Sequence, residues 1–228
     1  MTDDRKSGIA LIAGSLGLIL TMAMHPVATG SLTVAQGARL ALISGIAHSI
    51  AIVSALLLFL GACGLTARIG APDRLAFSAV VIYGFACVAL LIATTVSGFI
   101  VPGIINHMLR DVPANAHQWQ VVIVSIFQIN QAFAWILSIA ASLAIILWSA
   151  SALRNGGGLT RAVAIYGCIV SAVIILAVGS GRLHLDVHGM GAIALAQAIW
   201  FILVGSQLCS ENIEPLPAGS HKIASPSE

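Results

Sequence analysis

Charged side chains are scarce in this sequence: Asp, Glu, Lys and Arg make up 8% of its 228 residues. A soluble globular domain carries about 25% of such residues, which it needs to cover its surface. Hydrophobic residues make up 59% of the chain, so the expected solvent and main partner is a lipid bilayer. The net charge of +2 supplies no basic surface for nucleic acid, and no nucleic-acid partner is predicted.

Paired cysteines are also missing. The four cysteines form no CxxC motif and lie within or at the ends of apolar runs: Cys63, Cys87, Cys168 and Cys209. This pattern indicates neither a zinc ribbon nor a disulfide framework. We interpret the four thiols as small buried side chains.

Ionisable residues are absent from the interior of every long apolar run. Ion-coupled transporters and proton pumps usually carry one at that depth, so the sequence argues against both classes. The last run also contains no lysine, which excludes a retinal Schiff base.

What the sequence does contain is six long apolar runs. They predict an all-α bundle of six transmembrane helices in one domain (1–209), at about 8–25, 39–67, 75–101, 117–153, 160–178 and 186–209. Pro102-Gly103 is expected to end the third helix, and the polar connection 104–116 to hold a short interfacial turn. Residues 210–228, rich in proline, serine and charge, are predicted to be a disordered tail.

The first apolar run has a second interpretation as a signal peptide. Arg5 and Lys6 would form its basic n-region, and Val27-Ala-Thr29 its cleavage site. The apolar core 8–24 is 17 residues long, whereas a signal peptide has about 7–15. A retained helix is therefore favoured.

Lysine and arginine predict the orientation, because they accumulate on the cytoplasmic side. With both termini inside, seven lie on the inner side: Arg5, Lys6, Arg68, Arg74, Arg154, Arg161 and Lys222. Three lie on the outer side: Arg39, Arg110 and Arg182. We therefore expect both termini in the cytoplasm and a multi-pass protein of a cell membrane, the bacterial inner membrane being the expected location.

Histidines gather at one depth in this arrangement. His25, His48 and His188 lie 19 to 21 residues from the inner ends of their helices, counted from Lys6, Arg68 and Cys209. At about 1.5 Å per residue this places all three near the outer interface, roughly 30 Å away. His184 lies one turn further out, and Gln131 and Arg182 lie at the same level.

Neutral imidazole is a common metal ligand, so this layer predicts a metal or haem site open to the outer, periplasmic face. His48, His184 and His188 are the predicted ligands, with His25 as a fourth. The spacing of His184 and His188 suits chelation by one helix face if the helix is already formed at 184. Three histidines with an open position suit zinc, nearby methionines favour copper, and two facing histidines would suit haem b. Gln131 and Arg182 are predicted to contact the cofactor or an anion, and both redox and hydrolytic chemistry are compatible with such a site.

The same residues could also have purely structural roles. Histidines at a membrane interface can simply bond to water, and Asp186 suits the N-terminus of the last helix as a cap.

A polar face on the fourth helix supports a different class of function. Five side chains share that face: Gln128, Gln131, Trp135, Ser138 and Ser142. Amides are costly in lipid, so the face is expected to look into the bundle, lining a cavity or bonding to other helices. The alternative function is a non-catalytic accessory subunit or small-molecule channel, in which this face contacts a membrane-protein partner, a second copy of the chain or a pore.

Overall fold

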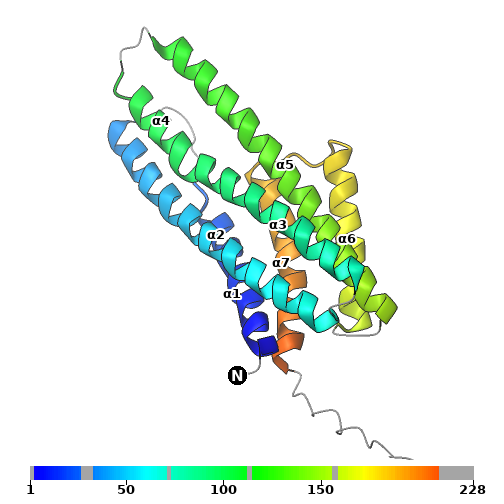
Figure 1. Ribbon diagram of the computed structural model, residues 1–228. Helices are drawn as coiled ribbons and strands as arrows, with labels where there is room; N and C mark the ends of the chain where they lie inside the picture. Colours follow the sequence, from blue (N-terminus) through cyan, green and yellow to red (C-terminus); the bar gives the residue numbers. More distant parts are fainter. Residues whose placement is uncertain (1–2, 27–32, 71–72, 112–114, 156–158, 211–228) are drawn as a thin grey trace, which may run out of the picture.

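The computed structural model describes residues 3–26, 33–70, 73–111, 115–155 and 159–210, and within these ranges it is all-helical (Figure 1). The elements are α1 (Asp3–Met24), α2 (Val34–Ile69), α3 (Arg74–Thr95), η1 (Val96–Ile100), α4 (Val101–Met108), α5 (Ala116–Asn155), α6 (Arg161–Gly179) and α7 (Val187–Ser210). Among the described residues, six helical spans are long and apolar enough to cross a membrane, the third made of α3, η1 and α4. This confirms the predicted six-span, all-α class and fits a multi-pass membrane protein. The proposed cleavage site and tail lie outside the described residues.

The six spans form a closed ring. Each span packs on the next one along the chain, and α7 packs back against α1. Two glycines allow this last contact, because a Cβ on Gly8 would lie 2.5 Å from the carbonyl oxygen of Gly205. Asp3 and Ser210 therefore lie at the same end of the bundle, which we call the terminal end. The opposite end, where α1 ends and α7 begins, we call the histidine end.

The histidine end is stepped because the spans differ in length. Spans α1, α6 and α7 have 22, 19 and 24 residues, whereas α2 and α5 have 36 and 40. At about 1.5 Å per residue, α6 is roughly 28 Å long and α5 roughly 60 Å. The long spans extend past the short ones at this end (Figure 1).

The third span does not end at Pro102-Gly103, so that prediction was wrong. A π turn, η1, follows α3, and α4 continues the helix to Met108. Pro102 lies in the first turn of α4, directly after the π turn, and lacks the N–H that a regular continuous helix would use there. The N–H of Val101 bonds to the carbonyl of Val96, the wider spacing of a π turn.

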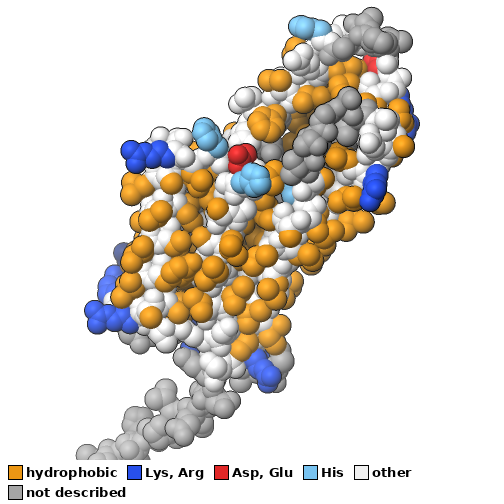
Figure 2. Space-filling view, turned by 180° about the vertical axis from the view of Figure 1, so that it is seen from behind, with side chains coloured by type: hydrophobic (Ala, Val, Ile, Leu, Met, Phe, Trp, Pro, Cys, Tyr) orange, Lys and Arg blue, Asp and Glu red, His pale blue; other side chains and the backbone are white. Residues whose placement is uncertain are grey.

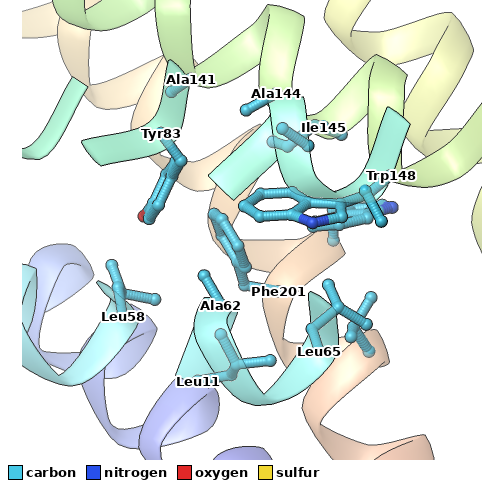
Figure 3. Packing of buried hydrophobic residues seen from close by; sticks show 14 of the residues in the cluster. Leu11, Leu58, Ala62, Leu65, Tyr83, Ala141, Ala144, Ile145, Trp148 and Phe201 are labelled. Atoms are coloured by element: carbon cyan, nitrogen blue, oxygen red, sulfur yellow. The ribbon is translucent and has the colours of Figure 1, made fainter. Parts of the chain in front are cut away.

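The core toward the terminal end is built from aromatic rings. Trp148 of α5 is fully buried and stacks on Trp200 of α7, with ring centroids 6.1 Å apart and planes at 17°. Tyr83 of α3 and Phe201 pack against Trp148 at 5.5 and 6.4 Å. Figure 3 shows Tyr83, Trp148 and Phe201 beside the aliphatic residues of α2. We call these four rings the aromatic cluster; they join three spans across the ring.

Asp73 joins α3 to α5 at the terminal end. Its carboxylate accepts hydrogen bonds from the N–H of Leu75, as the N-cap of α3, and from the hydroxyl of Ser151. The side chains of Arg154 and Asn155 also bond to it. The Ser151 hydrogen bond is the main cause that lowers the pKa of Asp73 to about 2.

This depressed pKa predicts acid sensitivity. Asp73 contributes stability that is fully present above its unfolded pKa of about 3.9 and is lost as the pH falls through its folded value. We expect Asp73→Asn to lower the melting temperature in detergent at pH 7 and to flatten its fall between about pH 4 and pH 2. Asp3→Asn is the control, because Asp3 is 96% exposed and its ion pair with Lys6 is screened by solvent. Equal effects of the two variants would contradict the role of Asp73.

Candidate functional site

A cavity of about 420 Å³ lies inside the ring and reaches the histidine end. Every span except α6 contributes described residues to its wall, together with the segment before α7. Its deep end is formed by Leu58, Tyr83 and Phe201, with Ser15 of α1 at the same level, while His25, His48 and Gln131 lie in its other half. Leu58 follows His48 by ten residues on α2, so the two levels are about 15 Å apart. The volume lies within the range of about 300–1,000 Å³ that small-molecule sites have.

His48 is held in one orientation by its own helix. Its side chain is 3% exposed, and Nδ1 lies 2.7 Å from the backbone carbonyl of Ser44, one turn earlier on α2. A carbonyl oxygen can only accept, so Nδ1 carries the proton and donates it. The neutral ring then has its lone pair on Nε2.

The π turn η1 provides the space that this ring occupies. The hydroxyl of Ser44 donates to the carbonyl of Ser97 at 3.1 Å and so joins α2 to η1. Gly98 lies directly against His48, because a Cβ there would come within 2.4 Å of the His48 Cβ and 2.6 Å of its ring Cγ. A π turn often accompanies a functional site, and here it brings a glycine to the histidine.

His25 lies beside His48 at the end of α1. The two ring centroids are 5.3 Å apart, with an edge-to-face angle of 69°. His25 Nδ1 is buried and has no hydrogen-bond partner among the described residues. Burial lowers the pKa of His25, so a neutral ring is expected at pH 7. Both residues were predicted at one depth, and their rings are in contact.

The polar face predicted on α5 is only partly turned inward. Gln131 and Ser138 line the cavity, and Ser142 is buried, where it accepts a bond from Gln197 at 3.0 Å. Gln131 also donates to the carbonyl of Leu185 at 3.1 Å, which ties α5 to the segment before α7. Gln128 and Trp135 are exposed instead, so their predicted inward position was wrong.

His184, His188 and Arg182 are all exposed, and none lines the cavity. The reason is that α7 begins at Val187, so His184 and His188 do not share a helix face. In the segment before it, Leu183 and Leu185 pack inward against a second apolar cluster, and His184 between them is exposed. Asp186 accepts a hydrogen bond from the N–H of Gly189 at 2.8 Å and thus caps α7, which is the structural role predicted for this residue. Histidine and acidic side chains are visible at the step in Figure 2.

A three-histidine metal site is therefore not formed by these side chains. Within the described ranges, no three His, Cys, Asp or Glu side chains are placed to hold a metal ion. A haem between His25 and His48 does not fit either, because rings in direct contact leave no space for a porphyrin between them.

Three residues of the cavity wall carry a buried polar atom without a hydrogen-bond partner among the described residues. These atoms are Ser15 Oγ, His25 Nδ1 and Asn130 Oδ1. Ser15 is fully buried in α1. Four more such atoms belong to described residues that do not line the cavity: Asn106 Oδ1, Ser149 Oγ, Ser171 Oγ and Trp200 Nε1. Unpartnered polar atoms are thus spread through the described bundle and are not concentrated at the cavity.

Comparison with protein-family models, curated proteins and solved structures gives no match.

Sequence reasoning missed Ser15 on this wall and Gly98, which packs behind the wall residue His48. Ser15 and Gly98 carry no pattern that separates them from the packing residues around them. Ser44 precedes His48 by one helical turn, and that spacing was the available signal for the carbonyl that fixes the ring.

Proposed function

We propose that this protein binds a small lipid-soluble molecule inside its helix ring. The cavity carries the proposal: it is lined by five spans, open at the histidine end, mostly apolar and aromatic at its deep end, and polar at the level of His25 and His48. A site with a mostly apolar wall and a few convergent polar groups is typical of small-molecule binding.

We also propose that the histidine end faces away from the cytoplasm. Lys and Arg are in excess on the terminal side by seven to three when the tail is counted with it. The molecule would then enter from the outer leaflet or the space beyond it, at the step between short and long spans.

Photolabelling in lipid nanodiscs tests the proposal. A small apolar probe, trifluoromethyl-phenyldiazirine, is expected to label the peptides that carry Tyr83 and Phe201, which are 5% and 3% exposed and so out of reach of lipid. Ser138→Phe should fill the cavity and remove this labelling, whereas Leu143→Phe, 39% exposed on the same helix, should not. If Ser138→Phe does not fold, Ala194→Phe on the wall formed by α7 serves instead. Absence of label on both peptides in the native chain would refute the proposal.

The contact between His25 and His48 favours a second candidate, a single copper ion held by both rings. Two imidazole nitrogens bind a metal at about 2.0 Å, which a small rotation of rings 5.3 Å apart allows. Met22 also lines the cavity, and a thioether with imidazoles favours Cu(I). Stoichiometric copper in protein purified without chelator, lost in His25→Ala, would support this candidate, and metal-free protein would exclude it.

A further inference from the structure

We infer that the cavity recognises a neutral amphiphile whose polar head is a hydroxyl group, with His48 Nε2 as the hydrogen-bond acceptor. This inference rests on the proposed function and specifies the ligand's chemistry. Three features carry it: the charge of the wall, the fixed tautomer of His48, and the position of the ring above the mostly apolar deep end.

The charge of the wall argues against an anionic head. None of the described lining residues is Lys or Arg, and Asp186 brings a carboxylate to the mouth. A fatty-acid carboxylate or a phosphate would thus be buried without a cation, which is costly. The Asp186 carboxylate does not select an ammonium deeper in the cavity, because it is exposed and already caps α7.

The tautomer of His48 selects a donor. Both hydrogen bonds that the described residues make with this ring involve Nδ1, at 2.7 Å to the carbonyl and 3.4 Å to the hydroxyl of Ser44. That hydroxyl already donates to Ser97, so it accepts from Nδ1 and cannot fix the other tautomer. Nε2 therefore offers a lone pair to a ligand O–H.

The deep end selects the remainder of the ligand. Below His48 the wall continues for about 15 Å to Leu58, Tyr83 and Phe201, which offer mostly apolar and aromatic surface beside the hydroxyl-bearing Ser15. A hydroxyl bound at His48 would hold an alkyl chain or an aromatic ring in this lower half. Long-chain alcohols and phenols, including quinols, share that chemistry.

Matched photoprobes test the inference in nanodiscs. They share one diazirine-bearing alkyl chain and end in a primary alcohol, a phenol, a carboxylate, an ammonium or a methyl group. We expect the alcohol or the phenol to label the Tyr83 peptide about fivefold more strongly than the methyl-ended probe, the factor of one neutral hydrogen bond. The ratio of these two probes distinguishes an aliphatic from an aromatic head. The carboxylate and ammonium probes should label no more than the methyl-ended probe.

Variants of His48 separate this inference from the proposed function. His48→Phe should remove the advantage of the hydroxyl probes and leave labelling by the methyl-ended probe intact. His48→Gln, whose amide oxygen can take the place of Nε2, should keep part of the advantage of the hydroxyl probes. This variant also tests the inference if His48→Phe does not fold. His107→Phe, which changes an exposed histidine, is the control. A preference for carboxylate or ammonium, or a hydroxyl advantage that survives His48→Phe, would overturn the inference alone. No labelling by any probe would overturn the proposed function.

Discussion

Trp148→Ala is expected to lower the free energy of unfolding by about 3 kcal/mol, the lower end of the range for buried tryptophan in soluble cores. Trp148 is fully buried and contacts Tyr83, Trp200 and Phe201, so its removal leaves a cavity between three spans. The lower end applies because separated helices stay in lipid, and transfer out of water contributes little. Reversible unfolding in bicelles measures the change.

Trp135→Ala is the matched control, since this residue lies on the same helix and is 48% exposed. Its loss should change the free energy of unfolding by less than about 0.5 kcal/mol. Trp148→Phe separates packing from hydrogen bonding, because it retains a ring but loses the bond from Nε1 to Thr66 Oγ1, 2.9 Å long. Loss of this bond should lower the free energy of unfolding by close to 0.6 kcal/mol, the average for such bonds between membrane helices. The smaller ring should lower it further, because it fills less of the space. Similar losses for Trp148→Ala and Trp135→Ala would show that the aromatic cluster does not hold the ring of spans together.

Gly98→Ala is expected to displace His48 and abolish the preference of the cavity for hydroxyl probes. The new methyl group would lie 2.4 Å from the His48 Cβ, a contact that forces the helix or the ring to move. Overpacking of this kind costs about 1–3 kcal/mol of stability. Photolabelling and unfolding of the same preparation measure both effects.

Gly103→Ala controls for the change from glycine to alanine in the same span, because nothing lies within 4 Å of a Cβ at that position. It should leave labelling unchanged. His48→Gly offers a second check, because it removes the group with which the new methyl collides. His48→Gly should lower the free energy of unfolding less in the Gly98→Ala background than in the native chain. A double-mutant cycle measures this coupling. Additive losses would show that the two residues do not compete for one space.

The sequence predicts the number of spans well because each apolar run needs only its own composition to be recognised. Which spans contact each other in the ring cannot be predicted in this way. The contact between α1 and α7 depends on Gly8 and Gly205, residues almost 200 positions apart that carry no pattern of their own. The continuation of the third span past Pro102 was missed because a π turn is set by packing, here against His48.

Depth along a helix could be counted from the sequence, but rotation about the helix axis could not. Counting placed His25 and His48 at one level, and their rings are in contact. The same counting included His188 and His184, which are exposed, because Leu183 and Leu185 are the residues before α7 that pack on the second apolar cluster. The inward position predicted for Trp135 and Gln128 was wrong for the same reason. A polar stripe on a 40-residue helix need not face the bundle over its whole length.

The meeting of the first and last spans has a consequence for biogenesis. A nascent chain delivers α1 to the bilayer first, and its buried Ser15 and Thr21 face acyl chains or transient neighbours until α7 emerges from the ribosome. Because α7 supplies part of the cavity wall and completes the ring of spans, a chain arrested before Val187 lacks a complete cavity. Ligand capture is thus a property that only the finished polypeptide acquires.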